Sequence, residues 1–194
     1  MKYLIAVTLI ISLFSCGQHE SVSETQLSKE KLCVLETSLG TMVFRFFEED
    51  APETCKNIQD LVQAGYYNGK DFYRVVKGHV IQAGGGGKTV PPEFNDNPHL
   101  VGTVGLGRTE DINSGSSEFY ICLAPRPHLD GKYTVFGQLI EGLDVLEKIG
   151  NVEVDEKWVG PDKKIAVHKP KSPVIIKKAS LKPQAKKQEG QENQ

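Results

Sequence analysis

The sequence predicts a mainly β fold, in which a closed antiparallel barrel is accompanied by two helices. Short apolar runs alternate with Gly and Pro breaks along most of the chain, a pattern typical of short strands joined by turns. Only two segments show the spacing of apolar residues that an amphipathic helix requires. Because short strands leave exposed edges unless their sheet closes on itself, this pattern favours a barrel.

The first predicted elements are a hairpin and a helix. Residues 32–37 and 42–47 have strand patterns and are separated by a turn that contains Gly40. The helix is expected to begin at Pro52, because proline suits a first helical turn, and to stop at Gly65. An apolar stripe between these two positions gives the helix a face to bury.

The rest of the domain is predicted to consist of strands around one more helix. That helix covers residues 142–149, where apolar residues recur at threefold spacing. Residues 151–172 show little pattern and are expected to form a long surface loop. The remaining strands are expected at residues 71–76, 79–83, 101–106, 118–123, 133–139 and 173–179.

The residues before this domain carry a targeting pattern. The apolar run that ends at Phe14 is shorter than the roughly 20 residues that a helix needs to span a bilayer, so residues 1–15 are expected to be a signal peptide. A leucine three places before Cys16 resembles a lipoprotein processing site, which predicts a lipidated Cys16 as the mature N-terminus. Phe14 departs from that pattern, and an ordinary secreted signal is the alternative.

The segments that flank the domain at residues 31–181 are expected to lack structure. Residues 16–30 are polar and rich in Ser and Glu, which predicts a flexible, lipid-anchored tether. Residues 182–194 are expected to be a disordered tail. A lipoprotein would face the periplasm, on the outer membrane rather than the inner one because Gly17 is not a retention aspartate. A soluble secreted or periplasmic protein is the alternative.

Charge and cysteine spacing exclude several classes of protein. The formal net charge of −2 gives no footprint for nucleic acid, and the His and Cys residues have no metal-ligand spacing. If Cys16 is lipidated, Cys33, Cys55 and Cys122 remain, and free buried thiols are the simplest interpretation. An oxidising compartment also permits one disulfide, and the sequence does not choose the pair.

One arginine, Arg74, lies among apolar residues in the segment FYRVVKGHVIQAGGGG at residues 72–87. Strand alternation would place Phe72 and Arg74 on one face, while Tyr73 and Val75 would face the other way. A guanidinium is always charged and is seldom buried unpaired. Arg74 is therefore either a barrel-end arginine held by a salt bridge or a residue with a functional role.

Together with SEFYICLAPRPHLDGKYTVFG at residues 117–137, this segment resembles the cyclophilins, a family of peptidyl-prolyl cis-trans isomerases. The resemblance covers roughly residues 31–180 and implies an eight-stranded barrel with a helix over each end. The loop LGRTEDINSGSSEFYI is most similar to the bacterial members. The positions that match the family pattern are Phe72, Arg74, Gly78, Gln82, Gly84, Ser117, Phe119, Ile121, Leu129, Asp130, Gly131, Lys132, Val135, Phe136 and Gly137.

The resemblance implies roles for individual residues. Arg74 matches the catalytic arginine, and Gln82 matches the glutamine that holds the substrate backbone beside it. Three residues occupy the pocket that grips the proline ring: Leu129 matches its leucine, Tyr120 stands in place of its phenylalanine and Val80 in place of its methionine. Core packing is an alternative for these three. The other implied substrate-binding positions are Phe72, His79, Gly107, Arg108, Glu118, His128 and Tyr133.

Several of these positions depart from the family pattern. His79 replaces a pocket phenylalanine, which makes one wall less apolar and adds a group that titrates near neutral pH. Glu118 replaces a glutamine and either pairs with Arg74 and orients it or competes with substrate. Gly107 stands in place of an alanine and His128 in place of a tryptophan. These differences predict a weaker or more selective enzyme than a typical member.

The implied function is the isomerisation of Xaa-Pro bonds in exported proteins by a monomer, without cofactor, metal or covalent intermediate. Arg74 would stabilise the twisted amide. The alternative is a binding module, a lipoprotein that grips extended proline-containing segments with little turnover. The run GGGGKT is similar to a phosphate loop, but Gln82 stands where that motif requires a glycine. Prolines also follow the run and forbid the helix that such a loop needs.

Overall fold

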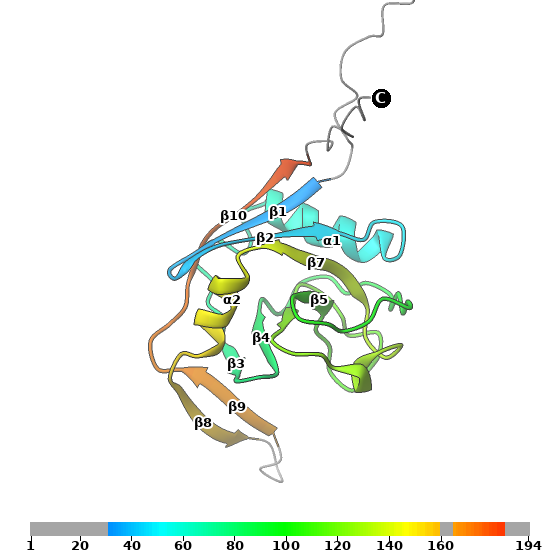
Figure 1. Ribbon diagram of the computed structural model, residues 1–194. Helices are drawn as coiled ribbons and strands as arrows, with labels where there is room; N and C mark the ends of the chain where they lie inside the picture. Colours follow the sequence, from blue (N-terminus) through cyan, green and yellow to red (C-terminus); the bar gives the residue numbers. More distant parts are fainter. Residues whose placement is uncertain (1–30, 160–164, 185–194) are drawn as a thin grey trace, which may run out of the picture.

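The computed structural model describes residues 31–159 and 165–184 (Figure 1). The predicted signal peptide, Cys16 and the tether at residues 16–30 lie outside the described residues, as does most of the predicted tail. Within the described ranges, no helix is long and apolar enough to cross a membrane.

One antiparallel sheet of eight strands forms the body of the described domain. In sheet order the strands are β10 (Ile176–Pro183), β1 (Lys31–Thr37), β2 (Gly40–Phe46), β7 (Val135–Glu141), β5 (Thr103–Leu106), β6 (Phe119–Cys122), β4 (Val80–Ala83) and β3 (Arg74–Val76). The predicted hairpin is confirmed, since β1 and β2 pair from Leu32 opposite Arg45 to Thr37 opposite Gly40.

The closed barrel that the sequence predicts is not confirmed, because the sheet curls into an open half-barrel. β10 and β3 are its two edge strands. The chain just before β3 passes the start of β10, where Asp71 forms an isolated bridge with Ile175 and the Phe72 N–H donates to the Val174 carbonyl at 2.9 Å. β3 begins only at Arg74, beyond this contact, and is three residues long. It therefore does not continue a ladder to β10.

Both predicted helices are confirmed. α1 spans Pro52–Gln63 and α2 spans Leu143–Gly150. Glu93 caps the start of α1, because its carboxylate accepts the backbone N–H of Glu53 at 3.0 Å and that of Thr54 at 2.8 Å. These N–H groups have no partner inside a helix, and a negative charge is favourable at that end. α1 packs against β10, and α2 packs against β2, β3 and β4.

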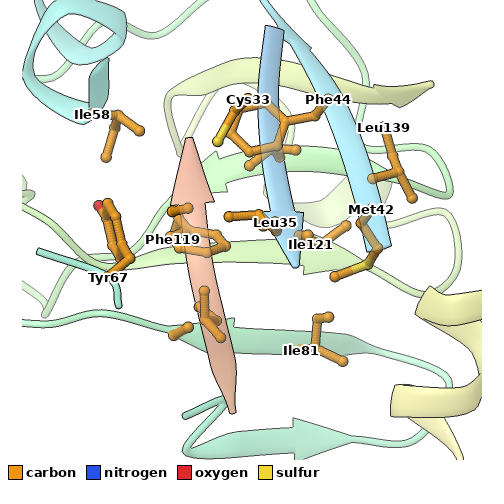
Figure 2. Packing of buried hydrophobic residues seen from close by; sticks show 14 of the residues in the cluster. Cys33, Leu35, Met42, Phe44, Ile58, Tyr67, Ile81, Phe119, Ile121 and Leu139 are labelled. Atoms are coloured by element: carbon orange, nitrogen blue, oxygen red, sulfur yellow. The ribbon is translucent and has the colours of Figure 1, made fainter. Parts of the chain in front are cut away.

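The main core joins the curled sheet to residues of both helices (Figure 2). Ile58 projects from α1 toward side chains of β1, β2 and β6. Cys33, Cys55 and Cys122 are buried free thiols, as the simplest interpretation of the sequence has them. Burial raises the pKa of Cys55 and that of Cys122 to about 12. Both groups therefore remain neutral thiols near pH 7 and pack as small apolar side chains.

The expectation of a surface loop over residues 151–172 is wrong. β8 (Val154–Val159) and β9 (Ile165–Pro170) form a second antiparallel sheet, which extends from the body beside β3 (Figure 1). Charged residues interrupt the apolar alternation in both strands and hide the strand pattern. β10 runs to Pro183, so the first two residues assigned to the tail belong to the main sheet.

Candidate active site

Three neighbouring strands place the main candidate residues in one row. Arg74 on β3 lies opposite Gln82 on β4, and Gln82 lies opposite Tyr120 on β6. Side chains of directly opposed residues share a face of the sheet. The residues beside them in sequence, Ile81 and Ile121, point into the main core. The row therefore occupies the face turned away from that core.

A pocket of about 380 Å³ opens beside this row. Its apolar side has two walls in contact: Val80 and Tyr120 are buried, and Leu129 and Tyr133 pack against them. The lining residues are Tyr73, Arg74, His79, Val80, Gln82, Gly107, Arg108, Tyr120, Leu129 and Tyr133. All of them except Tyr73 are among the predicted site residues. The described residues contain no cluster of His, Cys, Asp and Glu that could hold a metal ion.

A chain of hydrogen bonds holds Arg74 at the edge of the pocket. Its Nη1 donates to Oε1 of Gln82 at 2.9 Å. The Nε2 of Gln82 donates to the Glu118 carboxylate, which also accepts the Tyr73 hydroxyl at 2.7 Å. Glu118 thus lies behind Gln82 and contacts Arg74 only through it, so the direct pair with Arg74, one of the two alternatives, does not form. This geometry favours the orienting role of Glu118 over competition with substrate.

Phe72 and Tyr73 face in the directions opposite to those predicted. Phe72 is fully buried and meets the Phe119 ring edge-on, with the centroids 6.2 Å apart. Tyr73 instead lines the pocket. The alternation fails because β3 begins at Arg74, so no ladder fixes the two residues before it. The expectation that Phe72 contacts substrate is wrong, and Tyr73 is a pocket residue that the alternation missed.

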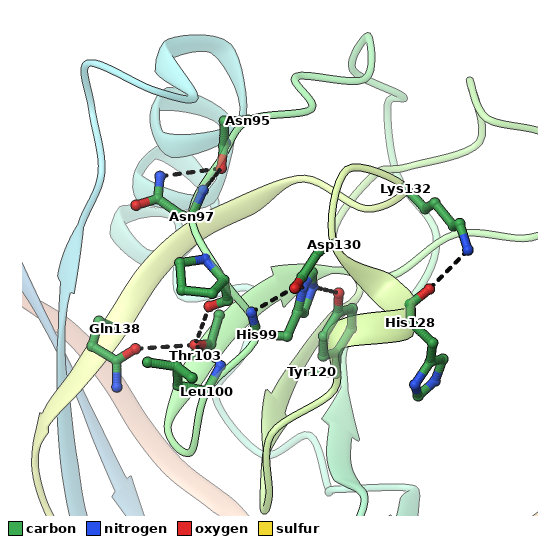
Figure 3. Close-up of polar contacts among 11 residues, drawn as sticks. Asn95, Asn97, His99, Leu100, Thr103, Tyr120, His128, Asp130, Lys132 and Gln138 are labelled. Carbon is green, nitrogen blue, oxygen red and sulfur yellow. Dashed lines mark hydrogen bonds and ion pairs between the residues drawn. The ribbon is translucent and has the colours of Figure 1, made fainter.

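A buried histidine behind the pocket joins two of its walls (Figure 3). The His99 side chain has 0% exposure, its Nδ1 lies 2.7 Å from Oδ1 of Asp130, and its Nε2 lies 2.8 Å from the Tyr120 hydroxyl oxygen. A carboxylate only accepts hydrogen bonds, so Nδ1 carries the hydrogen, and in the neutral ring Nε2 accepts the Tyr120 hydroxyl hydrogen. Because Asp130 directly follows Leu129, His99 ties the Tyr120 wall to the Leu129 wall.

The residues around Tyr120 accommodate its hydroxyl, so that a tyrosine can stand where the family pattern has a phenylalanine. Burial raises the pKa of Tyr120 above its usual value, and hydrogen bonds from the His99 backbone and ring lower the pKa of Asp130. The hydroxyl therefore stays protonated and points its hydrogen toward His99. A side chain at Gly105, opposite Tyr120 on β5, would collide with the tyrosine ring. Tyr120 thus lines the pocket while its hydroxyl is bonded to His99.

Two departures from the family pattern fit together at the back of the site. A Cβ atom at Gly107 would lie 2.5 Å from Oε1 of Glu118. The alanine expected at this place would push the carboxylate away from Gln82. The backbone N–H of Gly107 also donates to the Glu118 carbonyl at 2.7 Å. Glycine at one position therefore makes room for glutamate at the other.

His79 forms another wall of the pocket and is neutral at physiological pH. Burial, together with the positive charges of Arg126, Arg74 and His128, lowers the pKa of His79 to about 4. The expectation that this residue titrates near neutral pH is therefore wrong. His128 lies near His79 and is exposed. The centroids of the two imidazole rings are 6.0 Å apart.

A titration followed by NMR of the histidine rings is expected to give His79 a midpoint near pH 4. An unfolded histidine titrates near 6.5, so between these values the unfolded chain binds one more proton than the folded protein. His79 therefore makes the free energy of unfolding rise with pH across that window. His79→Phe should flatten this dependence, because phenylalanine binds no proton. A folded-state midpoint above pH 6 would contradict the expectation.

The fold is similar to that of solved proline isomerases. A cyclophilin type peptidyl-prolyl cis-trans isomerase of Cryptosporidium parvum superposes with a TM-score of 0.71 and 27% sequence identity, covering 80% of this chain and 99% of that one. A structure of the same protein in the presence of the dipeptide Ala-Pro gives a TM-score of 0.70 and 28% identity, with 79% and 99% coverage. The class of protein is therefore that of the cyclophilin-type isomerases.

The sequence relatives agree with this class. The family model described as cyclophilin type peptidyl-prolyl cis-trans isomerase/CLD matches residues 32–181. A peptidyl-prolyl cis-trans isomerase of Synechococcus elongatus is 43% identical over 128 residues, which are 61% of this chain and 88% of the relative. One from Helicobacter pylori is 34% identical over 150 residues, 71% of this chain and 91% of the relative. The chain belongs to the cyclophilin family of peptidyl-prolyl cis-trans isomerases.

Proposed function

We propose that this pocket isomerises Xaa-Pro bonds with Arg74 as its catalytic residue. Amide conjugation opposes rotation with a barrier of about 18–20 kcal/mol. A guanidinium N–H aimed at the prolyl nitrogen donates to its lone pair only when the bond is twisted and conjugation is lost. Such a donor binds the transition state more tightly than the ground state, which is the condition for catalysis. Arginine suits this task because its charge and donor geometry are fixed.

The placement of Arg74 across from an apolar wall carries this proposal. Val80, Tyr120 and Leu129 would hold the proline ring, while Arg74 reaches the nitrogen from the edge of the pocket. Gln82 lies between Arg74 and Tyr120 in the row, and it would hold the substrate backbone beside Arg74. The related Cryptosporidium protein was solved in the presence of Ala-Pro, which supports a proline-containing peptide as the ligand here.

The direct test is to measure cis-trans exchange of an Ala-Pro tetrapeptide by NMR. An isomerase raises the exchange rate in proportion to its concentration, whereas the uncatalysed process takes tens to hundreds of seconds. A parallel titration measures binding of the same peptide. A binding module, the alternative function, would bind the peptide without accelerating exchange, and that result would contradict the proposal.

Glu118→Ala is expected to lower kcat by about tenfold, because strong hydrogen bonds to a charged group are worth roughly 1.5–3 kcal/mol. Alanine removes the carboxylate that fixes Gln82 and Tyr73, so Arg74 loses its orientation. Glu118→Gln keeps an acceptor oxygen and should cost less. Glu49→Ala, which removes an exposed carboxylate elsewhere, should leave the exchange rate unchanged. A Glu118→Ala rate at or above that of the wild type would contradict the orienting role.

We also propose that the enzyme is a monomeric lipoprotein of the cell envelope that faces the periplasm and acts on exported proteins. The N-terminal apolar run and Cys16 support this proposal. In Figure 1 the start of β1 lies beside the end of β10, away from β3 and β4. A tether that ends at residue 30, directly before Lys31, would therefore leave the pocket open. Mass spectrometry of the mature N-terminus should find a lipidated Cys16. An unmodified terminus would favour the soluble alternative.

A further inference from the structure

Basic side chains with nitrogen donors lie together on one side of the pocket. His79 and Arg74 both line the pocket, and the exposed His128 ring lies 6.0 Å from that of His79. Arg126 stands at the start of the short 3-10 helix Pro127–Leu129. We call Arg126, His79 and His128 the basic cluster.

The charged groups that act on His79 are all cationic. Arg126, Arg74 and His128 each oppose a proton on its ring. The chain as a whole carries a formal net charge of −2. Arg74 and Arg126 therefore put positive charge beside His79 that the net charge of the chain does not reveal, and such a local charge attracts ligands of the opposite sign.

The arginines around the pocket bond only neutral groups. Arg74 donates to the amide of Gln82, and Arg108 donates to backbone carbonyls. No ion pair within the described ranges includes Arg126. The Nε of Arg126 and the Nδ1 of His79 are buried without a hydrogen-bond partner in this part of the chain. Buried polar atoms normally have partners, so these two are placed for a ligand that brings an acceptor.

The two carboxylates beside the pocket are already occupied. Glu118 accepts hydrogen bonds from Gln82 and Tyr73, and Asp130 accepts them from the backbone and ring of His99. Their hydrogen bonds run to the back of the site. Neither carboxylate therefore forms a hydrogen bond or an ion pair with Arg126 or His79 in the described ranges.

We infer that the basic cluster binds the carboxylate of an acidic substrate residue, so that the enzyme favours prolines with Asp or Glu close by. The inference rests on the proposed function, because the proline ring must occupy the pocket. An extended chain advances about 3.3 Å per residue, so a side chain one or two residues from the proline reaches a wall of the same pocket. Arg126 then donates to the carboxylate, and His79 donates from Nδ1.

The test compares two peptides that differ only by Glu or Gln directly after the proline. A second pair carries the same change directly before it. Catalysed exchange is measured by NMR with the full-length protein at low ionic strength. In at least one pair kcat/KM should be about two- to fivefold higher for the Glu peptide, the size expected of a partly exposed ion pair. The preference should fall toward one at about 0.5 M salt.

Two variants decide whether the basic cluster causes the preference. Arg126→Gln should bring the Glu/Gln ratio toward one. Arg45→Gln removes the same charge from the exposed face of β2 and should leave the ratio unchanged. A ratio near one in both wild-type pairs, or one that Arg126→Gln does not change, would overturn the inference. If exchange is accelerated in neither the Glu nor the Gln peptides, the isomerase proposal fails. The ratio of the Kd values of the Glu and Gln peptides, measured by titration, then decides the inference.

Discussion

Replacing Arg74 by alanine is expected to lower kcat for Xaa-Pro isomerisation by about two to three orders of magnitude, the usual cost of losing a donor to a transition state. The guanidinium meets the prolyl nitrogen only in the twisted amide, so KM should change much less than kcat. Stability should change little, because Arg74 is partly exposed on an edge strand and its side chain bonds Gln82.

Arg74→Lys tests whether charge alone is sufficient. Lysine keeps the positive charge but lacks the planar set of donors that Gln82 orients, so it should recover only a small part of the rate. NMR exchange measurements on both variants, with circular dichroism to confirm folding, give the result. Arg45→Ala is the matched control and should retain the wild-type rate. If Arg74→Ala stays within about threefold of wild type, a loss too small for a transition-state donor, the assignment is wrong.

The elements of the fold could be predicted where a local signal marks their ends. Pro52 marks the start of α1, and Gly40 marks the turn of the first hairpin. Whether the sheet closes into a barrel could not be predicted, because this depends on where Asp71 and Ile175 meet. These two residues are more than a hundred positions apart in the sequence. Local alternation contains no information about that meeting. It also failed for β8 and β9, whose charged residues conceal their strand period.

The candidate site was predicted mainly from the resemblance to the cyclophilins and less from the alternation of residues along the strands. The resemblance supplied Arg74 and Gln82, and the row across β3, β4 and β6 brings them together. Period-2 reasoning misplaced Phe72 because it assumed a strand that had not yet begun. His99 was missed because its partners lie 21 and 31 residues away. A signal existed, since a tyrosine in place of a pocket phenylalanine must find a partner for its hydroxyl.

Replacing His99 by leucine is expected to lower the free energy of unfolding by about 2–4 kcal/mol, since it breaks one buried and one partly buried hydrogen bond and leaves a hydroxyl unpaired. Leucine fills much of the space of the ring, but the Tyr120 hydroxyl is then buried without an acceptor. Asp130 loses its bond to the ring, so the Leu129 wall is no longer tied to the Tyr120 wall. KM for proline peptides should therefore rise more than kcat falls. Denaturant unfolding and exchange kinetics measure the two effects.

A double-mutant cycle with Tyr120→Phe distinguishes this role from simple core packing. Tyr120→Phe removes the hydroxyl and leaves the Nε2 of His99 unpaired, whereas the double variant with His99→Leu leaves neither group unpaired. The double variant should therefore lose about 1–2 kcal/mol less stability than the sum of the single variants. His99→Leu should also raise KM less in the Tyr120→Phe background, because phenylalanine presents the same ring face. A cycle with Tyr133→Phe is the control and should be additive. Additive losses in the Tyr120 cycle would show that His99 does not position the pocket through that hydroxyl.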